Sequence, residues 1–182
     1  MCNDIFTSSK KKGLNNMDIS IVEKYINDRM IEDLVLYCKS LSSNDFSVLI
    51  ELLINKLTSY KIPQERGERD TVALALGDLQ CNEAVPQIIE ILKKESESDY
   101  IGTLIYVLQN LECAEYLEQI FHLLYLGNYE VRRNMFTLLE ENRGKISQDM
   151  YNRMKKKLVK SIEDYKDRLL GLYIAQDDIF DN

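Results

Sequence analysis

The sequence predicts an all-α fold of stacked antiparallel helix pairs, with about eight or nine helices. Apolar residues recur at helical spacing from Asp18 onward, and one stretch of the chain repeats itself after 32 residues. The 182 residues also include only two prolines and seven glycines, which disfavours a turn-rich β fold. This length is enough for one domain with a sizeable core.

Residues 1–17 are polar and aperiodic, so we expect a disordered leader, followed by a single folded domain over residues 18–182. The leader has no apolar stretch after its basic residues, unlike a secretory signal, and no run of about 18 apolar residues follows it. We therefore expect a cytoplasmic protein with no membrane segment. Met17 directly precedes the first patterned segment, so translation could start there rather than at Met1.

The first helix pair is expected at about residues 18–60. Apolar residues from Ile19 to Leu41 keep helical spacing, and Asp18 precedes them as an N-cap. Residues 42–45 then break the pattern and offer capping oxygens for a second helix, which should end near Tyr60. Pro63 closes this region, because the residue before a proline is pushed out of the α conformation.

The chain repeats itself in its central part. Residues 75–94 align with residues 107–126, and a third, weaker copy begins at Glu130 with its second helix from about Ser147 to Ile162. Further helix pairs are therefore expected at about 68–94, 100–126 and 130–165. Residues 167–182 should form a capping segment, in which Leu169, Leu170 and Tyr173 cover the open end of the stack.

Residues 68–94 resemble a HEAT repeat, and the resemblance is weaker at residues 100–126 and 130–162. The features that match are Arg69 early in the first helix, Ala75-Leu76-Gly77, Leu79 before the turn, Ala84-Val85-Pro86 at the start of the second helix, and Val131-Arg132 in the third copy. The resemblance implies a short right-handed α-solenoid. Gly77 would let the two helices of a pair approach closely, and Pro86 suits the first turn of a helix.

Metal and catalytic chemistry are not expected. The four cysteines, at positions 2, 38, 81 and 113, form no CxxC pair, and His122 is the only histidine. In a cytosolic chain, such cysteines are usually small buried apolar residues. His122 has no evident carboxylate or nucleophile to complete a catalytic set. We expect no catalytic residue, cofactor or metal ion.

Charge is unevenly distributed along the chain. Residues 65–118 contain twelve acidic and four basic side chains, whereas residues 147–168 contain seven basic and four acidic ones. An acidic central surface would attract a basic protein partner and raise its association rate. Nucleic acid is a disfavoured partner even for the basic Lys155–Lys157 cluster, because such affinity depends on neutralising phosphates and the neighbouring repeats are acidic.

These observations predict a non-catalytic, protein-binding HEAT-like solenoid that holds a basic partner on an acidic concave face. In size and charge it resembles the bacterial immunity proteins that neutralise basic nuclease toxins, so a toxin domain is one expected partner. Five tyrosines of the middle repeat could belong to the interface or to the core, with Tyr106 expected in the core. The predicted contact residues are Glu83, Gln87, Glu90, Lys94, Glu115, Gln119, His122 and Tyr125.

Two alternatives remain open. One is a HEAT-scaffold enzyme or lyase that acts on a nucleotide or a tetrapyrrole, which would need a deep concave pocket with converging polar groups. The other is an adaptor subunit of a larger assembly, which would differ from an inhibitor in the identity of its partner.

Overall fold

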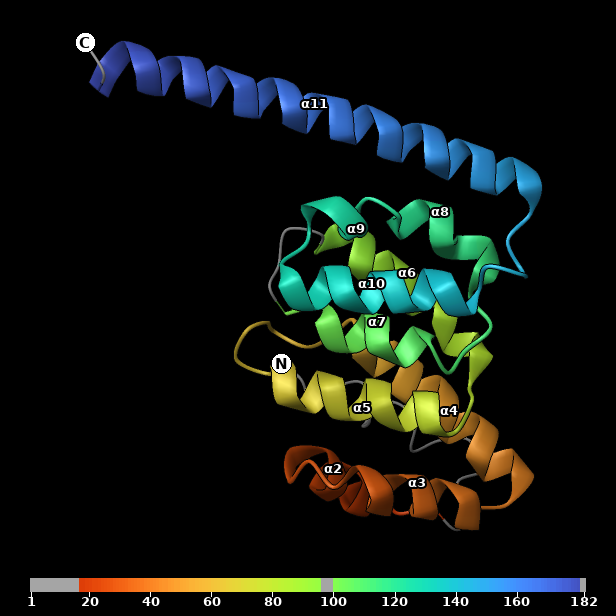
Figure 1. The fold of residues 1–182 in the computed structure, drawn as a ribbon. Coiled ribbons are helices and arrows are strands. Elements are labelled where there is room, and N and C mark those ends of the chain that lie inside the picture. The colour runs from red at the N-terminus through yellow and green to blue at the C-terminus, as the bar shows by residue number, and fades with distance from the viewer. Residues whose placement is uncertain (1–16, 96–99, 181–182) are drawn as a thin grey trace. The chain divides into compact units, whose positions relative to one another are not determined.

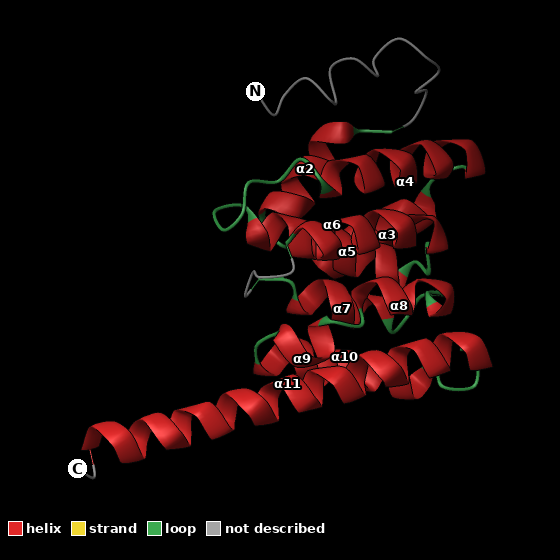
Figure 2. Cartoon of the chain, turned by 90° about the horizontal axis from the view of Figure 1, so that it is seen from above, coloured by secondary structure: helices red, strands yellow, loops and turns green. Residues whose placement is uncertain are grey.

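The computed structural model describes residues 17–95 and 100–180, and all of their regular structure is helical (Figures 1 and 2). The all-α prediction is confirmed, with ten α-helices in these residues rather than eight or nine. They are α2 (Ile19–Asn27), α3 (Ile31–Ser40), α4 (Ser43–Leu57), α5 (Arg66–Asp78), α6 (Val85–Lys94), α7 (Gly102–Leu108), α8 (Leu117–Ile120), α9 (Leu123–Leu126), α10 (Tyr129–Glu141) and α11 (Gln148–Phe180). Two 3₁₀ helices, η2 (Asn82–Ala84) and η3 (Ala114–Tyr116), precede α6 and α8.

The helices fall into two compact units. The first ends at Glu141 and contains α2 to α10, and the second begins at Asn142 and contains α11. The predicted leader lies outside the described residues except for Met17, which is buried. In the described part of the chain, no helix combines the length and the apolar character needed to cross a bilayer.

The first helix pair begins as predicted but contains an extra break. Asp18 caps α2 by accepting a hydrogen bond from the Ser20 backbone N–H at 2.9 Å. The Ser20 hydroxyl donates a second bond to the same carboxylate at 2.7 Å, and this bond, followed by the backbone one, lowers the pKa of the Asp18 carboxyl. One continuous helix was expected up to Leu41, whereas Arg29 adopts a φ of 58° and separates α2 from α3. The guanidinium of Arg29 lies against Gly67 in the first turn of α5.

The start of α4 follows the prediction closely. Ser42 is the N-cap: its hydroxyl accepts a hydrogen bond from the Asp45 backbone N–H at 3.2 Å and donates one to the Asp45 carboxylate at 2.8 Å. These reciprocal bonds satisfy a backbone donor that the first turn of the helix would otherwise leave unpaired. The helix ends at Leu57, shortly before the predicted end near Tyr60.

Helices that are distant in the sequence contact one another in a regular order within the first unit. Helix α5 contacts α3 and α7, α7 contacts α10, and α6 contacts α4 and α8 (Figure 1). Three hydrogen bonds join segments that lie 30 to 32 residues apart. They run from the Arg69 guanidinium to the Tyr100 carbonyl, from the Glu112 backbone N–H to Asn82 Oδ1 at 2.8 Å, and from Asn134 Nδ2 to the Gly102 carbonyl at 3.0 Å.

The core of this unit contains most of the apolar residues that define the repeat, including Leu76, Leu92, Leu108 and Phe121. Gly77 does permit a close approach, but the neighbouring helix is α7 rather than its own partner α6. A Cβ atom at Gly77 would lie 3.0 Å from Cγ1 of Val107.

Two expectations about individual segments of the middle repeat need correction. Tyr106 was expected in the core, and it is exposed because it faces outward between the buried Ile105 and Val107. The second helix of this repeat is divided at Phe121 and His122 into the short helices α8 and α9. Together with the break at Arg29, this division accounts for the larger number of helices.

The second unit consists mainly of α11, which runs without interruption from Gln148 to Phe180. A helix end near residue 165 and a separate capping segment were expected. The helix instead continues to Phe180, and neither proline nor glycine interrupts it before Gly171. Leu169 and Leu170, which were expected to cover the end of the helix stack, are exposed. The side chain of Tyr173 lies outside the described residues.

Candidate functional site

The eight predicted contact residues lie on α6, on the α8–α9 segment and on the 3₁₀ helices that precede them. The side chains of Glu83, Glu90, Lys94, Glu115 and Gln119 are exposed. Those of Gln87, His122 and Tyr125 are half-buried. None of these eight side chains is fully buried. We call these eight residues the second-helix surface.

Helix α6 is amphipathic, and its polar side carries Gln87, Glu90 and Lys94 of the second-helix surface. Ile88, Ile89 and Leu92 are buried, and Gln87, Glu90 and Lys94 follow one another at intervals of three and four residues on the other side. The Nζ atom of Lys93 lies 2.6 Å from Glu90 Oε1.

The bond between Lys93 and Glu90 changes the charge that this surface can offer. The hydrogen bond and the positive charge of Lys93 lower the pKa of the exposed Glu90 carboxyl. Glu90 therefore stays ionised at neutral pH, but its negative charge is partly compensated by its neighbour. Glu83 and Glu115 form no such ion pair among the described residues, and they carry more of the uncompensated charge.

The division between α8 and α9 alters the other half of the second-helix surface. A continuous helix was expected to leave His122 on an exposed face, whereas His122 is half-buried as the N-cap residue of α9. The ring of Tyr125 meets the buried ring of Phe121 edge to face, with centroids 6.2 Å apart. Tyr125 therefore packs against the core through Phe121 and has only part of its ring available for a partner.

The turns that precede α6 and α8 lie against each other, which the sequence did not predict. Asn82 Oδ1 accepts the hydrogen bond from the Glu112 backbone N–H, so the two turns are joined directly. Glu83, Glu112 and Glu115 are all exposed on these turns. We call these three exposed glutamates on the two joined turns the acidic turn edge. The sequence shows an asparagine in one turn and a glutamate 30 residues later. It does not show that the two turns are in contact, because this depends on how the helices pack.

The cysteine residues of the described part are buried, as predicted. Burial is the main cause that raises the pKa of Cys38 to about 12 and that of Cys81 to about 11, and the charge of Glu83 adds to the effect at Cys81. Cys113 is also buried. Cys2 lies outside the described residues. In the same described part, no group of three or more His, Cys, Asp and Glu side chains is placed to hold a metal ion.

We predict that these thiols are unreactive in the folded protein. In a Cys2→Ser variant at pH 8, a thiol with a pKa near 11 is ionised in only about one molecule per thousand, so reaction with a disulfide reagent should be very slow. Absorbance of the released thiolate measures the rate, and unfolding in guanidinium should expose all three thiols at once. Rapid labelling of Cys38 or Cys81 in the native protein would contradict their burial.

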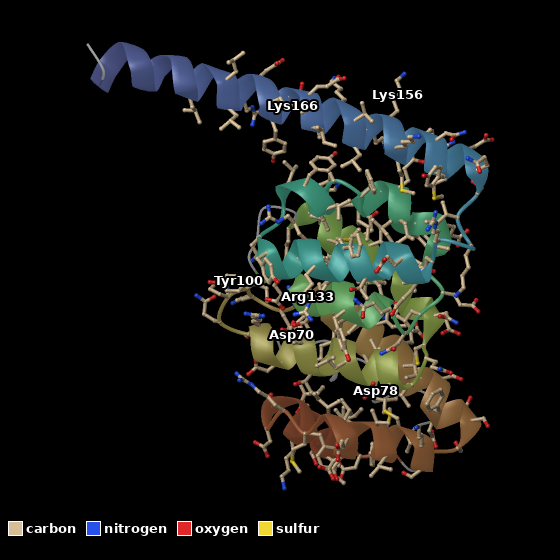
Figure 3. The ribbon with its side chains drawn as sticks, viewed as in Figure 1. Asp70, Asp78, Tyr100, Arg133, Lys156 and Lys166 are labelled. Carbon is tan, nitrogen blue, oxygen red and sulfur yellow. The ribbon has the colours of Figure 1, made fainter. Side chains whose placement is uncertain are left out.

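A fully buried arginine joins α5 to the segment that begins α7. The Nη1 atom of Arg69 lies 3.0 Å from Glu95 Oε2, Nη2 lies 3.1 Å from Asp70 Oδ1, and Nη2 also donates to the Tyr100 carbonyl. Arg66 binds Asp70 at 3.2 Å and lies 5.3 Å from the centre of the Tyr100 ring. Figure 3 shows Asp70 and Tyr100 at the same end of α5 and α7. We call these residues the Arg69 network.

A polar cavity of about 250 Å³ lies beside α2, the end of α4 and the start of α5. Its lining residues are Glu23, Asn27, Lys56, Ser59, Tyr60, Glu65 and Glu68. None of them belongs to the second-helix surface. Three carboxylates against one ammonium group repel the phosphate or carboxylate groups that nucleotides and tetrapyrroles carry. This cavity therefore does not resemble the pocket that the lyase alternative requires.

Comparison of the chain with protein-family models, curated proteins and solved structures found no match.

Proposed function

We propose that this chain is a non-catalytic, protein-binding α-solenoid of the HEAT-like kind, and that it holds a basic protein on the second-helix surface and the acidic turn edge. A basic toxin domain is a partner of suitable charge, because the small size and the acidic centre of this chain are those of an inhibitor that covers a positive surface.

The order of helix contacts supports the solenoid part of the proposal. In a solenoid, each helix pair contacts only its neighbours, so contacts recur at the length of one repeat. Here α3, α5, α7 and α10 contact one another in succession. The hydrogen bonds between residues 30 to 32 positions apart match the 32-residue interval of the sequence repeat.

The acidic turn edge is the observation that carries the binding part of the proposal. Glu83 and Glu115 are exposed on two turns that the hydrogen bond between Asn82 and Glu112 joins, so the two negative charges belong to neighbouring turns of the same surface. Like charges on two joined turns favour a partner with matching positive charges. Asp78, at the end of α5, adds a further exposed carboxylate (Figure 3).

Charge reversal on the acidic turn edge tests this function. The wild-type chain, immobilised at low salt, should retain a basic protein from a lysate of its own cells, and mass spectrometry would identify that protein. With the purified partner, Glu83→Lys combined with Glu115→Lys should raise the Kd at least about 10-fold, and the wild-type affinity should fall as salt increases.

The matched control makes the same change of charge on α10. This is the first helix of its repeat and carries no residue of the second-helix surface or the acidic turn edge. Glu130→Lys combined with Glu141→Lys replaces two exposed glutamates of α10 and should leave the Kd within about twofold of the wild-type value. Retention of no basic protein would refute the proposal. Equal loss of affinity in both double variants would also refute it, because net charge rather than the acidic turn edge would then determine binding.

A further inference from the structure

Helix α11 presents a row of apolar side chains at coiled-coil spacing. Leu158, Ile162, Tyr165, Leu169 and Leu172 follow one another at alternating intervals of four and three residues. This alternation places all five on one side of the helix, as the a and d positions of a heptad repeat do. We call these five residues the α11 row.

The α11 row is largely open to solvent. The exposed fractions are 45% for Ile162, 46% for Tyr165, 52% for Leu169 and 68% for Leu172. Single exposed apolar residues are ordinary on a protein surface, but a continuous row of them at heptad spacing is typical of a surface that binds another helix. The length of α11 gives it a span of about 50 Å, which offers ample contact for a partner helix.

The charges of α11 indicate which helix that partner is. Residues 148–162 contain five basic and one acidic side chain, whereas residues 163–180 contain five acidic and two basic ones. Figure 3 labels Lys156 in the basic half. Basic groups near the N-terminus and acidic groups near the C-terminus oppose the helix dipole, so this order does not stabilise an isolated helix.

We propose that α11 is a dimerisation helix that pairs in antiparallel orientation with α11 of a second copy of the chain. In this orientation the basic half of each helix faces the acidic half of the other, and the two helix dipoles run in opposite directions. The same contact is made twice around a two-fold axis. A parallel pair would place like charges together at both ends. The helix is thus complementary to itself, and the α11 rows of the two copies form the apolar seam.

The mass of the full chain in solution tests the dimer. Light scattering after size-exclusion chromatography should give twice the mass of one chain for the wild type. Leu169→Lys should raise the dimer Kd at least about 100-fold, because each dimer would bury two charged groups in the seam in place of two leucines. The matched control is Leu170→Lys, which changes the next residue, also a leucine and 60% exposed, but outside the α11 row. It should remain a dimer.

Charge reversal tests the antiparallel orientation and the choice of a second copy. One variant carries Lys155→Glu, Lys156→Glu, Lys157→Glu and Lys160→Glu, and another carries Glu163→Lys, Asp164→Lys and Asp167→Lys. Each alone should be monomeric, because both halves then have the same sign. An equimolar mixture should restore a heterodimer.

A pair of engineered cysteines reports the orientation directly. Lys155→Cys lies three residues before Leu158 and continues the heptad positions of the α11 row, and Leu172→Cys replaces the last residue of the row. After mild oxidation of a Cys2→Ser background, peptide mass spectrometry should find a bond between position 155 of one chain and position 172 of the other. Bonds between identical positions would overturn the antiparallel pairing, and a wild-type chain that stays monomeric at its highest soluble concentration would overturn the dimer.

Discussion

Arg69→Ala should lower the free energy of unfolding of the first unit by about 3 kcal/mol. The substitution removes the cation that binds Asp70, Glu95 and the Tyr100 carbonyl. Asp70 keeps its ion pair with Arg66, whereas Glu95 loses the arginine that it binds. Removing one partner of a buried ion pair destabilises a protein by more than the intact pair stabilises it, because the remaining charge is still partly desolvated. Glu95 is partly exposed and can recover some hydration, which places the effect at the lower end of the usual range.

Urea unfolding followed by circular dichroism would measure this loss. Arg132→Ala is the matched control, since Arg132 occupies the corresponding position of the third repeat but is exposed, and it should change stability by no more than about 0.5 kcal/mol. Arg69→Lys keeps the charge but cannot reach all three acceptors, so it should also be destabilising. If Arg69→Ala and Arg132→Ala behaved alike, the Arg69 network would not hold α5 to α7.

Arg69 and Arg132 occupy the same position in the repeat, but Arg69 is buried and Arg132 is exposed. The alignment gave both arginines one position, and that position is early in a first helix in both cases. Their environments differ: Arg69 binds Asp70, Glu95 and the Tyr100 carbonyl, whereas Arg132 is exposed and is followed by Arg133 instead of an aspartate. A repeat pattern predicts the path of the backbone, but the partner of a charged side chain depends on residues that the copies do not share.

Helix boundaries were predictable where the chain carries a local signal. Asp18 and Ser42 both cap helices as expected, because a side-chain oxygen at that position satisfies free backbone N–H groups. The breaks at Arg29 and at Phe121 carry neither proline nor glycine, so nothing in the sequence marked them. At the first of them, Arg29 lies against Gly67 of α5, a contact between segments far apart in the sequence that local patterns do not reveal.

Exposure within the candidate site was similarly predictable only in part. Amphipathic spacing was sufficient to place Glu90 and Lys94 on the outside of α6, since their neighbours Ile91 and Leu92 are buried. The acidic turn edge could not be derived in this way. It depends on the contact of two turns that are 30 residues apart, which only the packed structure defines.

Phe121→Ala should lower the free energy of unfolding by about 4 kcal/mol. Phe121 is only 5% exposed, and its removal leaves a cavity where α8 and α9 meet. The substitution also removes the edge-to-face contact with Tyr125, which stabilises the position of α9. Because Tyr125 belongs to the second-helix surface, the variant should bind a partner of that surface more weakly even under conditions in which it remains folded.

The matched control for this prediction is Phe136→Ala in α10. Phe136 is the same residue type but is 56% exposed, so its replacement should change stability by no more than about 0.5 kcal/mol. Thermal and urea unfolding of the two variants, measured side by side, would separate the effect of burial from the effect of losing an aromatic ring. If the two variants were equally stable, Phe121 could not occupy the buried position between α8 and α9. This half of the second-helix surface would then lack its buried contact at Phe121.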